Sequence, residues 1–172
     1  DSIGGVIASG SGTDLSFINA AVMKDSFGLG LDLMSDLARN PGFATGEIER
    51  QRQQALSALK VAAEDPDSVA DRVIDRLIYG FHPYGMPGAG TPESLASLTR
   101  ADFVDFHKKY FVPNNALIAV VGDITSEDAM KGLEKYFGGW KPAEVPPLNM
   151  TDRPLVTRRI ILIDKKKVLQ TE

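Results

Sequence analysis

The segment between Pro41 and Pro66 constrains the fold more than any other part of the chain. It begins GFATGEIERQRQQALSAL, with Glu47 and Glu49 in its first turn, where the helix dipole favours acids. Its apolar side chains recur at helical spacing, at Ile48, Ala55, Leu59 and Ala62. The pattern predicts an amphipathic helix that starts near Thr45 and ends at the break EDP.

The neighbouring segments predict a hairpin and two further helices. Residues 3–23 contain two β-like runs around a Gly/Ser-rich turn at Gly10 to Thr13. A first helix is expected in residues 25–40, where apolar side chains keep helical spacing at Phe27, Leu31, Met34 and Ala38. Asp65 as N-cap and Pro66 as the first helical residue predict a third helix.

The second half of the chain predicts a long loop, short helices and one buried strand. Residues 79–90 are rich in Gly and Pro, and Thr91-Pro92 starts a short helix. The run ALIAVV, residues 116–121, ends at Gly122-Asp123 and is typical of a buried strand. Thr125 is expected to cap a last helix. Together these elements predict an α+β fold: a mixed or antiparallel sheet with helices packed on one face.

Composition changes after Trp140, which indicates a domain boundary. KPAEVPPLNMTDRP is a proline-rich connector, and RRIILID beyond it is predicted to form another strand. The expected organisation is a first domain over residues 1–140, a linker over 141–154 and the start of a second domain over 155–172.

Bulk composition excludes several classes of function. The 172 residues are 43% hydrophobic and carry a net charge of −4, with no extended basic face for nucleic acid. There is no cysteine, hence no disulfide, thiolate metal site or cysteine nucleophile. No apolar run reaches the roughly 20 residues that span a bilayer. The sequence does not distinguish an exported protein from a cytoplasmic one.

No catalytic or metal-binding constellation is visible in the sequence. A catalytic zinc site needs three protein ligands and a nearby carboxylate, whereas His82 and His107 stand alone and the motif HxxEH is absent. We expect His82 in a turn and His107 on a solvated side of its helix. The glycine-rich start, GVIASGSG, matches no phosphate-binding pattern and favours an edge strand. The pair Asp71 and Asp75 is expected on a solvated helix face.

Three segments carry a family resemblance: PGFATGEIERQRQQAL, GFHPYGMPGAGTPESLASLTRADFVDFHKKYFVPNNALIAVVGDIT and LIDKKKVLQTE. Together they resemble the pitrilysin/insulinase family of zinc peptidases, which includes the mitochondrial processing peptidase. The most specific part is HPYG followed by a PNNA…VGD strand. The resemblance implies a clamshell-shaped peptidase, in which each half consists of two related α/β domains. This chain would be the first domain of one half without its HxxEH segment, which would lie upstream of residue 1.

The resemblance also implies where the third zinc ligand would lie. The family pattern, Arg-Glu followed seven residues later by Glu, places its two acids at Gln51 and Ala58. No shift of register restores two acids at that spacing. An amide and a methyl group are poor substitutes for carboxylates, so no zinc is expected in this chain and it would belong to a catalytic partner or an upstream segment.

The resemblance implies a noncatalytic partner half that helps to bind peptide for a zinc metalloendopeptidase. Ile7, Ala8 and Ser9 match the strand to which family peptidases add substrate as an extra β-strand. A subunit or domain contact at this edge is equally expected. Two alternatives stay open: an active metallopeptidase with HxxEH upstream, and a structural subunit like the core proteins of the respiratory complex. An arginine/tyrosine pair beyond Glu172 would favour the noncatalytic peptide-binding partner over a purely structural subunit.

Overall fold

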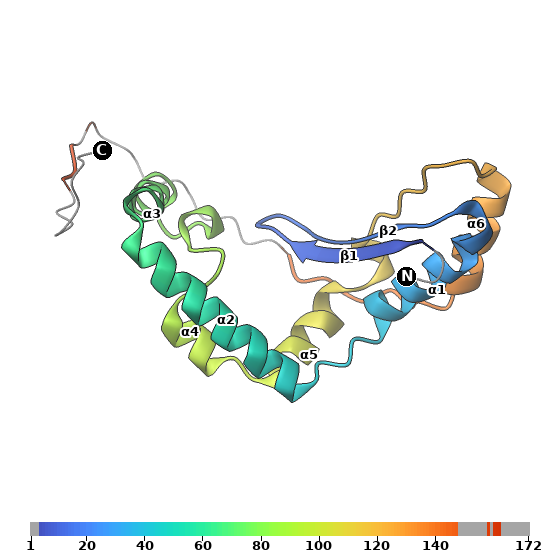
Figure 1. Cartoon of the computed structure of the whole chain (residues 1–172), viewed down its shortest axis with the longest axis horizontal. Coiled ribbons are helices and arrows are strands. Elements are labelled where there is room, and N and C mark those ends of the chain that lie inside the picture. The colour runs from blue at the N-terminus through green and yellow to red at the C-terminus, as the bar shows by residue number, and fades with distance from the viewer. Residues whose placement is uncertain (1–3, 148–157, 159, 163–172) are drawn as a thin grey trace. The chain divides into compact units, whose positions relative to one another are not determined.

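The computed structural model describes residues 4–147, 158 and 160–162, and these form an α+β protein (Figure 1). Contacts divide the described residues into two compact units. Unit 1 contains the described residues up to Phe43 together with Ala101–Pro147, and unit 2 contains Ala44–Arg100 together with the described residues 158 and 160–162. Each unit has its own secondary structure and is described separately below.

Unit 1 begins with the predicted hairpin. Strand β1 (Val6–Ser11) pairs antiparallel with β2 (Ser16–Ala21), in the register Ile7 to Ala20 and Ser9 to Ile18. The turn lies slightly later than expected, because the Gly12 amide donates to the Leu15 carbonyl at 2.8 Å and closes a loop over Thr13 and Asp14. The sheet of the described residues consists of these two strands.

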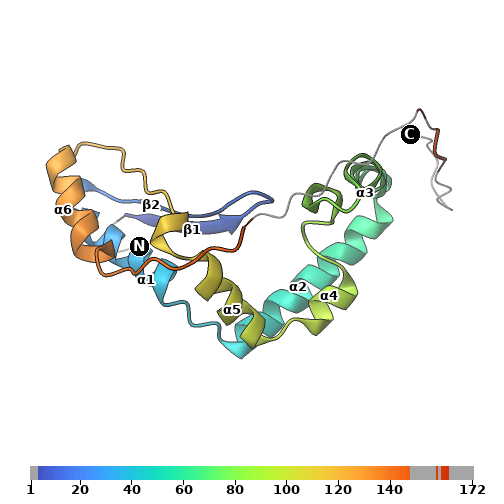
Figure 2. The same ribbon diagram turned by 180° about the vertical axis from the view of Figure 1, so that it is seen from behind.

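The core of unit 1 lies around α1 (Phe27–Arg39), which follows the short 3-10 helix η1 (Lys24–Ser26). Helix α1 packs against β2 on one side and against α6 (Ser126–Phe137) on another, and the two opposed views agree on this (Figures 1 and 2). The buried apolar residues of the described chain all lie in this unit: Leu31, Ala38, Val112 and Ala129. Buried Ser35 donates to the Tyr136 carbonyl at 2.8 Å, which ties α1 to the end of α6.

Unit 2 is built from helices. Helix α2 (Thr45–Glu64) is followed at once by α3 (Pro66–Tyr79), then by the 3-10 helix η2 (Pro83–Gly85) and the short α4 (Pro92–Ser97). The predicted caps are confirmed, since the Asp65 side chain accepts from the Ser68 amide and Thr91 forms a capping box with Ser94. Helix α5 (Arg100–Tyr110) starts in unit 2 and continues into unit 1, where η3 (Pro113–Asn115) follows it.

The prediction of a buried strand over Ala116–Val121 is wrong. This segment forms no strand with any described residue, and Leu117 and Val121 are 91% and 97% exposed. An apolar run becomes a strand only where another strand satisfies its backbone groups, whereas β1 finds its partner across a two-residue turn. Local composition therefore predicted a strand for which the described residues provide no partner.

The predicted domain boundary stays a prediction. Residues 148–154 of the connector and most of residues 155–172 lie outside the described residues. Of the predicted RRIILID strand, residues 158 and 160–162 are described, and they are exposed and form no strand with any described residue. The first residues of the connector belong to unit 1, because the Asn114 side chain and the backbone of Ala143 exchange hydrogen bonds of 2.9 and 3.2 Å. Among the described residues, no helix combines the length and hydropathy needed to cross a membrane.

Candidate functional site

Helix α2 carries the two positions that the sequence singled out as a degenerate zinc site. Gln51 and Ala58 are both exposed, and their spacing of seven residues, about two turns, places them on one face. An alanine methyl group has no atom that can bind a metal, and within the described part of the chain no group of three or more His, Cys, Asp or Glu side chains could hold one. The side chains present at this face therefore do not fit zinc.

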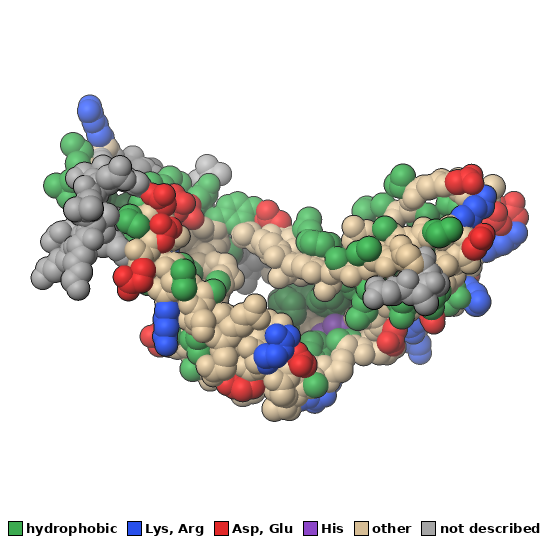
Figure 3. All heavy atoms as spheres, viewed as in Figure 1, with side chains coloured by type: hydrophobic (Ala, Val, Ile, Leu, Met, Phe, Trp, Pro, Cys, Tyr) green, Lys and Arg blue, Asp and Glu red, His purple; other side chains and the backbone are tan. Residues whose placement is uncertain are grey.

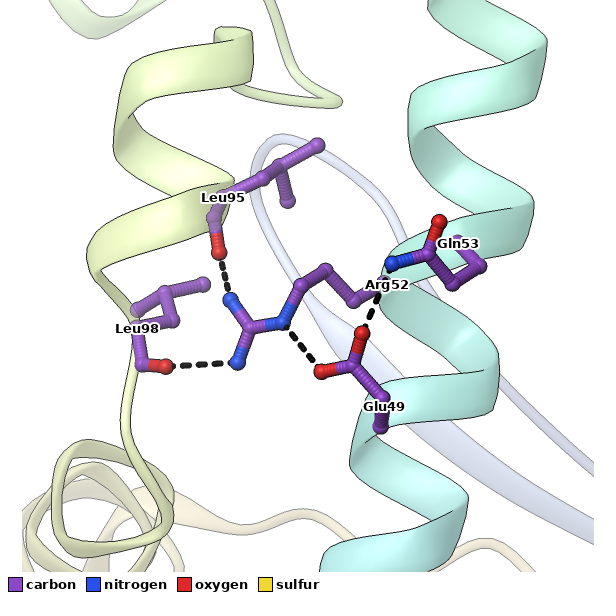
Figure 4. Close-up of polar contacts among 5 residues, drawn as sticks. All are labelled: Glu49, Arg52, Gln53, Leu95 and Leu98. Carbon is purple, nitrogen blue, oxygen red and sulfur yellow. Dashed lines mark hydrogen bonds and ion pairs between the residues drawn. The ribbon is translucent and has the colours of Figure 1, made fainter.

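Arg52, next to Gln51, braces α2 against α4. Its guanidinium donates to the carbonyl of Leu95 and, at 2.7 Å, to that of Leu98, while its Nε donates to Glu49 at 2.9 Å (Figure 4). The two carbonyls lie at the C-terminal end of α4, where a cation also satisfies the helix dipole. The side chain is only 16% exposed. Arg52 thus fixes the rotation of α2 and, with it, the direction in which Gln51 and Ala58 face.

Glu49 holds the Arg52 guanidinium in place. It accepts hydrogen bonds from the Gln53 amide at 2.7 Å and from Arg52, and these two bonds lower the pKa of its carboxyl group. The carboxylate is therefore kept ionised, in the form that orients Arg52.

A groove of about 380 Å³ runs beside Ala58 within unit 2. One wall comes from α2 and is apolar, with Ala55, Ala58, Leu59 and Ala62. The opposite wall is the polar face of α3, with Ser68, Asp71, Arg72 and Asp75, and residues 85–89 close the end. Gly85 is required here, because a side-chain carbon at this position would lie 2.6 Å from the Gly80 carbonyl oxygen. Ala58 thus lines a groove of mixed polar and apolar character.

The second candidate site is the free edge of β1, which contains Ile7, Ala8 and Ser9. All three residues are exposed. In an antiparallel pair, hydrogen-bonded and non-hydrogen-bonded positions alternate. The bond between Gly12 and Leu15 sets this alternation, so Ala8 pairs with β2 whereas Ile7 and Ser9 direct their backbone N–H and C=O groups to the free edge. Two residues of β1 are therefore placed to receive another strand.

The structure confirms one interpretation of the histidines and corrects the other. His82 is a turn residue, because its ring nitrogen accepts from the Tyr84 amide at the start of η2. His107 does not lie on a solvated side of its helix: it is half-buried, its Nε2 lies 2.8 Å from the Ala38 carbonyl oxygen, and its ring stacks on Phe111 at 4.8 Å. The two apolar neighbours of His107 in unit 1, Phe43 and Phe111, explain its burial.

Sequence reasoning missed Arg52 and the groove. A signal for Arg52 was available, because it lies on the same side of α2 as the apolar stripe of Ile48 and Leu59, and a cation on an inward face needs partners. The groove had no such signal, because it depends on the angle between α2 and α3 and on the path of residues 85–89.

Comparison with known proteins gives concordant results. Residues 97–171 match the family model described as the peptidase M16 inactive domain. An uncharacterized zinc protease of Mycobacterium leprae is 25% identical over 138 residues, which cover 80% of this chain and 31% of that protein. A probable mitochondrial-processing peptidase subunit beta of Schizosaccharomyces pombe is 30% identical over 128 residues, covering 72% and 27%.

A solved structure supports the fold. The crystal structure of a peptidase M16 inactive domain from Pseudomonas fluorescens superimposes with a TM-score of 0.80 at 22% identity, covering 88% of this chain and 37% of that one. The chain spans about a third of the length of the curated relatives it matches.

Proposed function

Because the chain belongs to the pitrilysin-type M16 peptidase family, we propose that it is part of a noncatalytic partner half that helps to bind peptide for a zinc metalloendopeptidase. The catalytic subunit, or the second half of a two-half chain, would supply the zinc. Peptide binding and partnership are proposals for the whole protein, of which this chain is about a third of the length found in relatives.

The observation that carries the noncatalytic assignment is the composition of one face of α2. Gln51 and Ala58 lie two turns apart, both are exposed, and Arg52 holds this face in a fixed rotation. A zinc ligand at Ala58 would need a carboxylate or an imidazole, and the methyl group offers neither. The helix thus keeps the geometry of a ligand-bearing element without its donor atoms.

The proposal of peptide binding is supported by the free edge of β1. An extended peptide adds to a sheet through main-chain hydrogen bonds, and Ile7 and Ser9 direct their backbone groups outward as this mode requires. The small side chains of Ala8 and Ser9 permit close approach of a second backbone.

Proline substitution tests the peptide-binding edge. Ser9→Pro removes an outward N–H without breaking a bond to β2, since proline lacks that donor. Ser16→Pro is the matched control, because Ser16 directs its N–H to the opposite, β2 edge. In the full-length protein, fluorescence anisotropy of a labelled nonapeptide of alanine, threonine and valine should report binding that Ser9→Pro weakens at least threefold and Ser16→Pro leaves unchanged. Equal binding by all three proteins would refute this edge as the site.

An active metallopeptidase is the second candidate, and the similarity to an uncharacterized zinc protease of Mycobacterium leprae favours it. In that case HxxEH lies upstream and another residue replaces the third ligand. Chelator-sensitive cleavage of casein by the full-length protein, without a partner, would establish this function. If no peptide is cleaved and none is bound, the chain has a structural role instead.

A further inference from the structure

We propose that Met86 is a site of reversible oxidation, at which Arg76 binds the oxygen of the methionine sulfoxide. This inference goes beyond the proposed function and does not depend on peptide binding. It starts from one contact within unit 2, where Nη1 of Arg76 donates a hydrogen bond to the sulfur of Met86 at 3.1 Å. A thioether sulfur is a weak acceptor, whereas a sulfoxide carries a polar oxygen that accepts strongly.

Arg76 is held in position independently of this sulfur. The same Nη1 donates to the Gly80 carbonyl oxygen at 2.7 Å, and Cζ lies 4.0 Å from the centroid of the Phe81 ring. The side chain comes from the last turn of α3 and is partly buried. Because a guanidinium has five N–H donors, Arg76 can bond to an oxygen on Met86 without releasing Gly80.

Met86 is accessible, and its backbone is fixed beside α3. The residue is 50% exposed, so a small oxidant can approach its side chain from solvent. Its amide donates to the Pro83 carbonyl oxygen at 3.1 Å. At the preceding Gly85, a side-chain carbon would lie 3.2 Å from the Asp75 carbonyl oxygen, which shows how closely the loop approaches α3. The sulfur therefore stays near Arg76 before and after oxidation.

Two other methionines provide a comparison within the same chain. Met23 and Met130 are 65% and 63% exposed, more than Met86. No described residue donates a hydrogen bond to either of their sulfur atoms. A peroxide should reach all three side chains, but only at Met86 does a cation stand ready to bind the product.

The oxidation takes one molecule of a peroxide, such as hydrogen peroxide. A lone pair of the Met86 sulfur attacks one peroxide oxygen, the S–O bond forms and the O–O bond breaks. The other oxygen leaves as hydroxide and takes up the proton of the first, which gives water. The thioether is thereby oxidised by two electrons to the sulfoxide, and the peroxide is reduced.

Oxidation at this position should tighten residues 80–86 on α3. A sulfoxide usually disrupts structure, because it places a polar group in apolar packing. Met86 is half exposed and already next to a guanidinium, so a charge-assisted hydrogen bond replaces a weak one at little cost in desolvation. Because residues 85–89 also close the end of the groove beside α2, the modification changes the lining of that groove.

The test treats the full-length protein with hydrogen peroxide, locates each sulfoxide by peptide mass spectrometry and follows hydrogen exchange of the backbone amides. Oxidation of Met86 should slow exchange of the Gly85 and Met86 amides about three- to tenfold. Methionine sulfoxide reductases should restore the original rates. Unchanged or faster exchange after oxidation of Met86 would overturn the proposal, as would a Met86 that stays reduced while Met23 and Met130 are oxidised.

Two variants assign the effect to the pair of side chains. Met86→Leu keeps an apolar side chain without sulfur, so peroxide should leave these amides unchanged although Met23 and Met130 are still oxidised. Arg76→Leu keeps the sulfur and removes the donors, so oxidation should not slow exchange relative to the same variant before treatment. This comparison within one variant excludes any loosening that Arg76→Leu itself causes. Slowing of the original size in either variant would contradict a sulfoxide bound by Arg76.

Discussion

The amphipathic helices α1 and α2 are held in place by different kinds of contact. In unit 1, α1 buries Gly30, Leu31, Ser35 and Ala38 between β2 and α6. In unit 2, no residue of α2 is fully buried, and the helix is braced by Arg52 and by half-buried alanines and leucines. Hydrophobic side chains are visible on the surface of both units in the space-filling view (Figure 3).

The two units therefore differ in the interactions that hold them together. Unit 1 is held by packing of apolar side chains, which cannot change without cost. In unit 2 the partly buried apolar residues of α2 are supplemented by the hydrogen bonds from Arg52 to the carbonyl groups of Leu95 and Leu98. We propose that the exposed face of α2 that carries Gln51 and Ala58 is one on which zinc ligands have been replaced.

The largest expected effect is loss of core packing in unit 1. Leu31 is 4% exposed, so Leu31→Ala should lower the free energy of unfolding by about 2–4 kcal/mol. Leu59 of α2 is only half-buried, so Leu59→Ala should lower the free energy of unfolding by about half as much as Leu31→Ala. Urea titration of both variants checks the contrast. Equal losses would mean that the two helices are packed alike.

The next effect concerns the polar brace of unit 2. Arg52→Ala removes three hydrogen bonds from a mostly buried guanidinium and should destabilise the packing of α4 on α2 by about 2–3 kcal/mol. Arg50→Ala is the control, because Arg50 pairs with Glu47 on the surface at 59% exposure and should matter by less than about 0.5 kcal/mol. Hydrogen exchange of the α4 amides would report the loss; unchanged exchange in Arg52→Ala would contradict the brace.

Two glycines sharpen the comparison with changes of opposite sign. A methyl group at Gly132 of α6 would lie 2.8 Å from the Leu31 side chain, so Gly132→Ala should cost about 1–3 kcal/mol of stability. At Gly46 of α2 no atom lies within 4 Å of that position, and Gly46→Ala should stabilise by about 0.5–1 kcal/mol. The midpoint of thermal unfolding should fall for Gly132→Ala and rise for Gly46→Ala. If both midpoints move in the same direction, the claim that Gly132 is closely packed and Gly46 is not would be contradicted.

The smallest effect is a pH dependence of the brace. Hydrogen bonds from Gln53 and Arg52 lower the pKa of Glu49 in the folded chain below its ordinary value of 4.5. The stabilisation is therefore present above pH 4.5 and is lost as the pH falls through the lower, folded-state pKa. In Glu49→Gln, the free energy of unfolding should decrease less steeply as the pH falls below 4.5. If the free energy of unfolding of Glu49→Gln depends on acid pH in the same way as that of the unmodified protein, a contribution from Glu49 is excluded.

The sequence predicted the local elements well because their signals are local. Caps such as Asp65 and Thr91 act within one helical turn, and the hairpin needs only a short turn between its strands. The α+β class and the family resemblance followed from segments of this kind. The positions of Gln51 and Ala58 on one face of α2 also followed, because helical geometry alone fixes them.

What the sequence could not predict depends on partners distant in the chain. Residues 116–121 have the composition of a buried strand, but strand formation needs a neighbour that the described residues do not provide. His107 contacts Ala38 across 69 positions of sequence, and the Arg52 bonds span 43 and 46. The groove arises in the same way, from two helices and a loop whose relative placement leaves no local pattern.

The central claim is that Gln51 and Ala58 mark a noncatalytic member of a zinc peptidase family. The most direct test is the zinc content per chain of the purified full-length protein, measured by atomic emission after dialysis and without a partner. We expect essentially none, and Ala58→Glu should restore binding only if HxxEH lies upstream. One zinc per chain in the unmodified protein would contradict the claim and would identify the protein as a metallopeptidase in its own right.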